Sequence, residues 1–288
     1  MTRRWLITGC SSGLGAALAA AAAARGDRVL ATARRPEAVA ELAGRYPDLI
    51  TTATLDVRDT ASCEAAVSRA VARLGGLDIL VNNAAYGQFG AVEEIDDDLL
   101  AEQLDTNVGG ALRMSRAVLP HLRAAGAGRI LMVSSTAAGI AYPGLGAYNA
   151  SKCALEGLAE TLAAEVAAFG IGVTILEPGG YATRYGAALR EPHRRIEAYG
   201  PITAAIHDGI RSMADGGPGV GQPAEFAAAV LALVDSGEHP MRLPIGAGVA
   251  DDLLAAWDRR RADMIAARDR RRAGLLAAHR VTGAPEPV

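Results

Sequence analysis

The feature that most constrains this chain is an alternation of short apolar runs with longer amphipathic stretches over its first two-thirds. The runs WLIT (5–8) and RVLATA (28–33) have the length of buried strands, and helical periodicity follows each of them. The same pattern recurs at DILVNNA (78–84), RILMVSS (129–135) and VTILEP (173–178). Strands that alternate with helices of this length predict an α/β fold, a doubly wound parallel sheet with helices on both faces.

The remaining elements of this sheet are expected where capping signals and periodicity agree. Asp59 is a suitable N-cap for a helix that runs toward Leu74, after a strand at 50–57. Two longer helices are expected at about 97–124 and at 148–169. Further helices are expected at about 14–25 and 224–235, with a short strand at 241–245.

Two segments depart from this rhythm. Residues 180–222 are rich in Gly, Pro, Tyr, His and Arg and are too long for an ordinary connection, which favours a substrate lid after the sixth strand. Residues 251–288 follow the domain of residues 1–250, and their many arginines and aspartates fit a solvated helical extension. The closing TGAPEPV is expected to be disordered.

Composition excludes several classes of protein. The 288 residues carry a formal net charge of −3, which gives no support to nucleic-acid binding. Cys10, Cys63 and Cys153 are scattered and lack CxxC spacing, which favours a reduced cytoplasmic setting. No run of strongly apolar residues is long enough to predict a membrane span. The histidines stand far apart, so no metal site is expected.

Two local motifs carry chemistry. The turn TGCSSGLG places Gly9, Gly13 and Gly15 between the first strand and the first helix, where backbone N–H groups can approach a pyrophosphate. In AYNASK, Tyr148 and Lys152 are one helical turn apart and share a face. An ammonium beside a phenol favours phenolate and lowers the pKa of the phenol toward neutrality. Taken alone, each motif has a plain alternative, a strand-to-helix turn and a surface Tyr–Lys contact.

An ordered set of motifs resembles the short-chain dehydrogenase/reductase family. The set comprises TGxxxGxG, LDV (55–57), NNA (82–84), DTNVGG around Asn107, VSS, YxxxK and EPGG (177–180). The resemblance runs from residue 5 to about 246, and TGCSSGLG with ATARRP looks closest to the branch of 17β-hydroxysteroid and retinol dehydrogenases. It implies a Rossmann-type domain and an oxidoreductase that interconverts a ketone or aldehyde with an alcohol. The alternatives are an inactive dinucleotide-binding sensor or scaffold, and a dehydratase or epimerase on the same fold.

The resemblance also implies a role for each matching residue. Tyr148 is the general acid/base, and Lys152 both acts on the phenol and reaches the cofactor ribose. Ser135, thirteen residues before the tyrosine and therefore preferred to Ser134, steadies the substrate oxygen. Asn107 props a water that relays protons to the lysine. The residues implied to bind the cofactor are Gly9, Ser11, Ser12, Gly13, Leu14, Gly15, Arg34, Arg35, Asp56, Val57, Asn83, Ala84, Ala85, Tyr148, Lys152, Pro178, Gly179 and Thr183.

Two positions in that set need comment. Asp56 is expected to accept a hydrogen bond from the adenine amino group, as the family's aspartate does. Ala85 stands where the family usually has glycine, and its Cβ would strain the backbone if φ were positive there.

The preferred cofactor is expected to be NADP(H) rather than NAD(H). The residue that ends the second strand decides this choice, because a carboxylate there repels a 2′-phosphate. Here the stretch Thr32-Ala33-Arg34-Arg35 holds no acid, and the guanidinium of Arg34 can bind the phosphate with two parallel hydrogen bonds. The alternative is that both arginines only decorate the helix that follows.

The partners follow from the lid and from the resemblance. A hydrophobic carbonyl or alcohol is the expected substrate, since the lid holds Tyr181, Tyr185, Ile196, Tyr199, Ile202 and Ile206. Members of the family usually pair the helices that correspond to about 97–124 and 148–169 across a twofold axis. The resemblance therefore implies a homo-oligomer, either a dimer or a tetramer.

Overall fold

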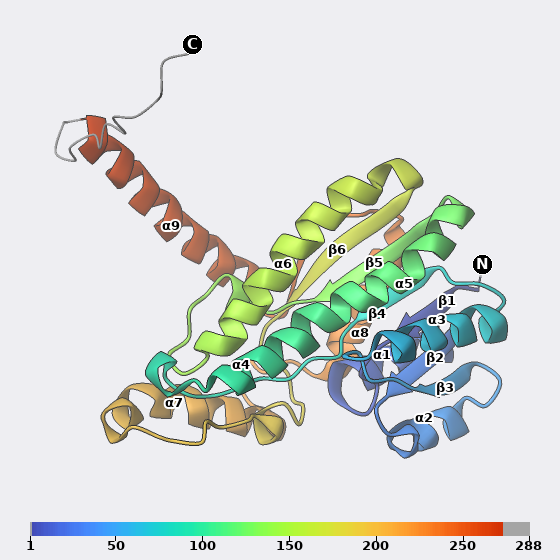
Figure 1. Ribbon diagram of the computed structural model, residues 1–288, viewed down its shortest axis with the longest axis horizontal. Helices are drawn as coiled ribbons and strands as arrows, with labels where there is room; N and C mark the ends of the chain where they lie inside the picture. The colour runs from blue at the N-terminus through green and yellow to red at the C-terminus, as the bar shows by residue number, and fades with distance from the viewer. Residues whose placement is uncertain (1, 273–288) are drawn as a thin grey trace, which may run out of the picture. The chain divides into compact units, whose positions relative to one another are not determined.

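The computed structural model describes residues 2–272. Within them, seven parallel strands form one sheet in the order β3-β2-β1-β4-β5-β6-β7, which confirms the predicted doubly wound α/β fold (Figure 1). The strands are β1 (Arg4–Ile7), β2 (Arg28–Ala33), β3 (Ile50–Thr54), β4 (Ile79–Asn82), β5 (Gly128–Val133), β6 (Ile171–Pro178) and β7 (Arg242–Ile245). β3 ends before the predicted residue 57, because the backbone N–H of Asp56 donates to the Ser62 hydroxyl instead of to a neighbouring strand.

Helices cover both faces of the sheet, and β1 shows why. Trp5 and Ile7 point to one face and Leu6 to the other, so apolar side chains have to be covered on both sides. The first face packs against α1 (Gly13–Ala24), α2 (Ala40–Arg45) and α8 (Pro223–Ser236). The second face packs against α3 (Thr60–Leu74), α5 (Gly110–Ala125) and α6 (Gly146–Val166).

The predicted cap of α3 is confirmed, because the Asp59 side chain accepts a hydrogen bond from the backbone N–H of Ala61 at 3.0 Å. The prediction of one continuous α-helix at 97–124 is wrong for its middle residues. A π-helical turn, η3 (Asp105–Gly109), separates α4 (Asp97–Leu104) from α5. Such wide turns occur frequently at functional sites.

The lid contains a helix that the sequence reading missed. It is α7 (Gly200–Ser212), which begins with a glycine and a proline. Residues 189 and 190 of the lid lie beside the segment around Gly87, because the N–H of Arg190 donates to the carbonyl of Gly87 at 3.0 Å. Short 3₁₀ turns complete the elements, namely η1 (Pro36–Val39), η2 (Val92–Glu94), η4 (Thr136–Ala138), η5 (Ala167–Phe169), η6 (Gly186–Ala188), η7 (Glu197–Tyr199) and η8 (Met213–Asp215).

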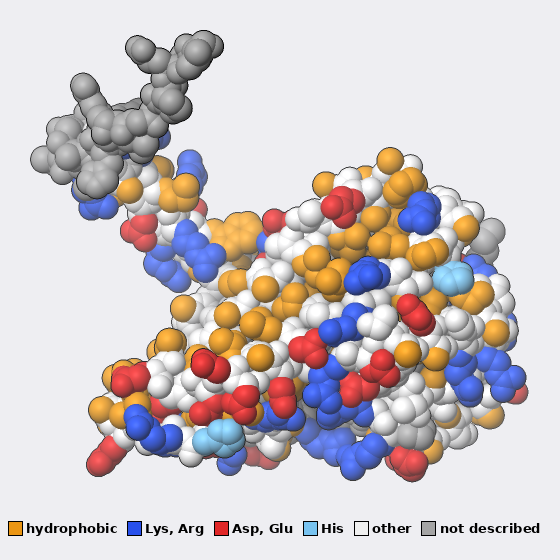
Figure 2. All heavy atoms as spheres, in the orientation of Figure 1, with side chains coloured by type: hydrophobic (Ala, Val, Ile, Leu, Met, Phe, Trp, Pro, Cys, Tyr) orange, Lys and Arg blue, Asp and Glu red, His pale blue; other side chains and the backbone are white. Residues whose placement is uncertain are grey.

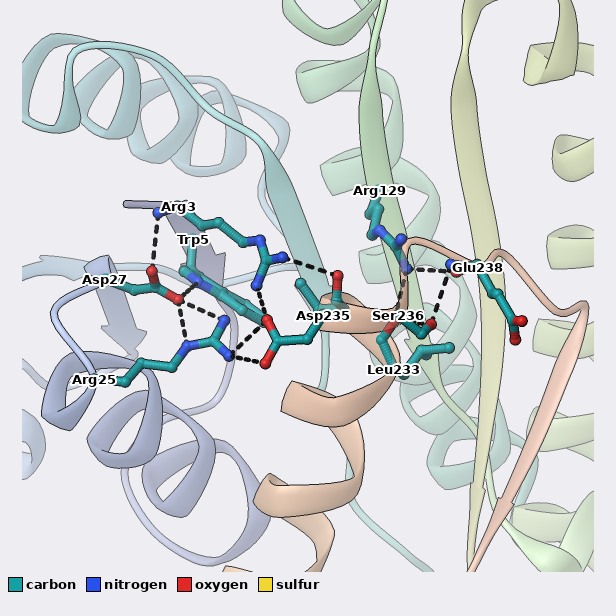
Figure 3. Close-up of polar contacts among 10 residues, drawn as sticks. Arg3, Trp5, Arg25, Asp27, Arg129, Leu233, Asp235, Ser236 and Glu238 are labelled. Carbon is teal, nitrogen blue, oxygen red and sulfur yellow. Dashed lines mark hydrogen bonds and ion pairs between the residues drawn. The ribbon is translucent and has the colours of Figure 1, made fainter. Parts of the chain in front are cut away.

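A polar cluster fastens α1 to α8 at the amino ends of the strands (Figure 3). Asp27 accepts from the indole N–H of Trp5 at 2.9 Å and pairs with Arg25. Arg25 in turn reaches Asp235 near the end of α8, with Nη1 3.0 Å from Oδ2, and Arg3 pairs with the same carboxylate. The opposite end of the sheet, where the strands end, is left for loops.

A second unit of the chain starts at Asp251 and contains most of α9 (Val249–Arg272). The part of the predicted helical extension after Arg272, and the closing TGAPEPV that is predicted to be disordered, lie outside the described residues. Within residues 2–272, no helix is both long and apolar enough to cross a membrane.

Candidate active site

A cavity of about 620 Å³ opens at the carboxyl ends of the strands, where the strand order reverses between β1 and β4. Open α/β sheets bind ligands at this position. Most of the residues predicted from the sequence line it. They are Gly9, Ser11, Ser12, Gly13, Leu14, Arg34, Asp56, Val57, Asn83, Ala84, Ala85, Ser135, Tyr148, Lys152, Pro178, Gly179 and Thr183. Gly15, Arg35 and Asn107 are predicted site residues that do not line it.

The glycine turn after β1 has the backbone that a diphosphate requires. Gly9 and Gly13 have φ values of +72° and +60°, in the left-handed region that favours glycine. A Cβ on Gly9 would lie 2.9 Å from the Cα of Ala84. Gly15 serves packing instead, because a Cβ there would collide with the side chain of Asn83. The turn leads directly into α1, whose N-terminus favours an anion, so these residues fit a dinucleotide.

Charged side chains gather where β2 and β3 end. Arg34 lines the cavity, and Asp56 pairs with Arg58 at 3.1 Å. The Arg58 guanidinium is the main cause that holds the pKa of Asp56 below its usual value. Arg58 was missed in the sequence, where nothing distinguished it from the chain's other arginines.

The backbone at Ala85 is not strained. No residue other than glycine has a positive φ within residues 2–272, so the alanine adopts an ordinary conformation. The replacement of the family's usual glycine therefore costs no backbone strain at this position.

Lys152 is fully buried, and its ammonium lies over the ring of Tyr148. Its ammonium donates to the carbonyl of Val133 at 2.8 Å and lies 5.5 Å from the centre of the Tyr148 ring. Burial lowers the pKa of Lys152 to about 8, and the carboxylate of Glu156 opposes that change. The pKa of Lys152 therefore lies much closer to neutral pH than that of an exposed lysine.

Tyr148 is buried, and the lowering of its pKa by Lys152 stays a prediction. Burial raises the pKa of Tyr148 to about 12, and the opposing contributions come from the hydroxyl groups of Ser135 and then Tyr185. In this arrangement the ammonium of Lys152 bonds to the end of β5, and the groups that lower the pKa of Tyr148 are hydroxyls.

The two serines at the end of β5 have different partners. The hydroxyl of Ser134 donates to Oε1 of Glu156 at 2.6 Å and is buried. Ser135 interacts with Tyr148 inside the cavity. The choice of Ser135 as the residue near a substrate oxygen stays a prediction.

Asn107 lies in the π-helical turn and is buried. Its side-chain nitrogen donates to the carbonyl of Tyr86 at 2.9 Å and to the hydroxyl of Ser151 at 3.0 Å, and its oxygen accepts from the N–H of Tyr86. The side chain thus links the segment after β4 to the residue before Lys152. The water relay predicted for it is not tested by these contacts.

Several cavity residues were not identified from the sequence as parts of the site. Their proximity depends on how the lid and the loops fold back, which leaves no local signal in the sequence. They are Arg58, Tyr86, Glu102, Tyr142, Arg184, Arg190 and Met213. Among the described residues, no group of three or more His, Cys, Asp or Glu side chains is arranged to hold a metal ion.

The comparisons with known proteins agree on one family. The model of the family described as "short chain dehydrogenase" matches residues 3–194. The oxidoreductase BOA17 of Botryotinia fuckeliana is 38% identical over 267 residues, which cover 90% of this chain and 97% of that protein. Human 17-beta-hydroxysteroid dehydrogenase type 1 is 39% identical over 189 residues, which cover 62% of this chain and 57% of that protein.

A solved structure extends the similarity to the whole fold. A short-chain dehydrogenase from Streptomyces avermitilis superposes with a TM-score of 0.84 at 37% identity, and the match covers 95% of this chain and 98% of that chain. The resemblance to the family and the enzyme class predicted from the motifs are therefore confirmed.

Proposed function

The chain belongs to the short-chain dehydrogenase family, and we propose that it interconverts a hydrophobic ketone or aldehyde with the corresponding alcohol, with NADP(H) as cofactor. As a member of this family it is an oxidoreductase that works with a nicotinamide dinucleotide. The observation that carries the proposal is that one cavity contains the glycine turn, Ser135 and Tyr148 together.

In this proposal the bound dinucleotide supplies or accepts the hydride. Tyr148 gives its proton to the carbonyl oxygen in reduction and removes it from the alcohol in oxidation. Ser135 donates a hydrogen bond to the same oxygen and steadies it as negative charge develops. Lys152 holds the end of β5 through Val133 and provides positive charge near the ribose.

Replacement of Tyr148 by Phe tests the proton transfer, because it removes the phenol oxygen and keeps the ring. With a panel of ketones and aldehydes and both reduced cofactors, turnover should fall by roughly 10²–10⁴-fold, while cofactor affinity stays nearly unchanged. Near-normal turnover in this variant would end the assignment. A wild-type protein that binds the cofactor and turns over no carbonyl would favour the scaffold alternative.

The preference for NADP(H) is supported by what stands at the end of β2. Arg34 lines the cavity, Ala33 ends the strand where a carboxylate would favour NAD(H), and Ser11 and Ser12 line the turn opposite. Charge-assisted hydrogen bonds of this kind contribute about 1.5–3 kcal/mol, which is roughly ten- to a hundredfold in affinity.

The double variant Ala33→Asp with Arg34→Ala should therefore move the preference toward NAD(H) by roughly that factor. Arg35→Ala is the matched control, because Arg35 is exposed and does not line the cavity. A wild-type preference for NAD(H), or an unchanged preference in the double variant, would show that Arg34 is not the selector.

We also propose self-association through α5 and α6. Figure 2 shows hydrophobic side chains gathered over these two helices. On α6 the exposed positions Ala154, Gly157, Thr161 and Ala164 form a stripe of small residues at helical spacing, which permits a close approach of two helices. Light scattering at micromolar concentration should give a dimer or tetramer, and a monomer would refute this part of the proposal.

A further inference from the structure

Tyr185, on the lid, has a hydroxyl group that is buried without a hydrogen bond of normal geometry. Buried polar groups in folded proteins almost always have a partner, so each exception needs an explanation. The ring of Tyr185 lies 5.4 Å from the ring of Tyr148, centre to centre, at a tilt of 53°. The unpaired hydroxyl is therefore next to the phenol to which the proposed function gives the proton transfer.

The surrounding backbone is shaped to admit this hydroxyl. Gly87, in the segment after β4, faces Tyr185 so closely that a Cβ on Gly87 would collide with the phenol oxygen. The lid is held at this place, because the N–H of Arg190 bonds to the carbonyl of Gly87 at 3.0 Å. Leu189 and Ile210 of the lid pack in the same apolar cluster as Tyr148. The position of the Tyr185 oxygen is thus fixed by both the lid and the loop below it.

We propose that the Tyr185 hydroxyl is a second member of the proton-transfer centre, which donates a hydrogen bond to the Tyr148 oxygen and stabilises its phenolate form. The inference rests on the proposed function, because Tyr185 acts through Tyr148. A phenolate accepts hydrogen bonds more strongly than a phenol does, so a donor at this place lowers the pKa of Tyr148. The interaction has this direction for both groups: it lowers the pKa of Tyr148 and raises that of Tyr185.

The other polar side chains around Tyr148 bond to other partners, so the donors to its oxygen are hydroxyl groups. On α6, Lys152 bonds to Val133, and at the end of β5, Ser135 provides the other hydroxyl. The loop before α6 contributes Tyr142, whose hydroxyl is directed to Thr136 at 3.3 Å. On α7, the Nε2 of His207 lies 3.3 Å from Oε1 of Glu191, and its ring packs against that of Phe89 at a tilt of 51°.

Tyr185→Phe tests the inference, because it deletes only the oxygen. In alcohol oxidation the phenolate is the active form, so kcat/KM rises with pH as Tyr148 loses its proton. In the variant this rise should occur about one pH unit higher, and at pH values below it kcat should fall roughly ten- to a hundredfold. The melting temperature should change little, since the ring keeps its packing and only one oxygen is lost. Tyr46→Phe, at the end of α2 and outside the cavity, is the matched control and should change neither quantity.

Gly87→Ala provides the second variant, because its Cβ displaces the Tyr185 oxygen and leaves the residue itself in place. It should move the pH profile in the same direction as Tyr185→Phe. A profile at the wild-type position in both variants would overturn the inference and leave the proposed function standing. If the wild type oxidises and reduces nothing, the proposed function fails, and a clear drop in the melting temperature of Tyr185→Phe then shows that the hydroxyl is structural and overturns the inference as well.

Discussion

Lys152 allows a quantitative test of how burial acts in this site, because it is the only lysine in the sequence. Its pKa falls from 10.5 to about 8 on folding, with burial as the main cause. Each pKa unit corresponds to about 1.36 kcal/mol, so the shift of about 2.5 units amounts to roughly 3.4 kcal/mol. Between pH 8 and 10.5 the unfolded chain holds a proton on Lys152 that the folded chain has released.

Stability rises with pH wherever the unfolded state binds more protons. The contribution of Lys152 to the free energy of unfolding should therefore be full above pH 10.5, decrease as the pH falls toward 8, and stay low below that. Cys10, Cys63 and Tyr148 have raised pKa values and act in the opposite direction at high pH. The quantity to measure is thus the difference in the free energy of unfolding between the wild type and Lys152→Met. The contributions of those three groups cancel in this difference.

Chemical denaturation of both proteins across this range should give a difference that increases by about 3 kcal/mol from pH 8 to pH 10.5. In parallel, isotope-labelled lysine should give a single side-chain NMR signal that titrates near pH 8. A flat difference together with a midpoint near 10.5 would refute the reasoning, since the lysine would then be hydrated as in a free peptide.

Three further substitutions test other contacts. Glu156→Gln removes the carboxylate that raises the pKa of Lys152, so the midpoint of the lysine signal should move further down, and an unchanged midpoint would contradict this contact. Gly9→Ala should weaken cofactor binding in a fluorescence titration, because φ is +72° and the new Cβ meets Ala84; wild-type affinity would disprove the role of the turn. Asp59→Ala should reduce the free energy of unfolding by about 0.5–2 kcal/mol through loss of the helix cap, with activity retained as the check that the site is intact.

The sheet could be predicted from the sequence because its signals are local. The strand at 28–33 and the cap at Asp59 depend on residue types that are adjacent in the chain. The break at Asp105–Gly109 left no such signal, since the apolar pattern continues through it and only the contacts of Asn107 with distant residues favour the wide turn. The helix α7 was missed because its glycines and proline are also typical of loops.

The candidate site could be predicted only in part for a similar reason. The motifs identified the side chains that carry chemistry, but not the direction in which they point. Lys152 is at the expected place on the helix, and its ammonium bonds to Val133 because that carbonyl lies at the end of the neighbouring strand. Arg58 and Tyr86 reach the cavity through the folding of the loops after β3 and β4, which depends on tertiary structure alone.

The π-helical turn between α4 and α5 has a consequence for which changes in length this chain can tolerate. An α-helix rotates by about 100° per residue. A π turn holds one residue more than an α turn, so α4 and α5 keep their relative orientation across the wider turn. If one residue were deleted from Asp105–Gly109, the turn could close into a continuous α-helix, and Gln103 on α4 and Met114 on α5 would both stay buried. Asn107 would lose the wide turn from which it bonds to both Tyr86 and Ser151. A single-residue deletion in this segment should therefore leave the fold intact and damage the candidate site.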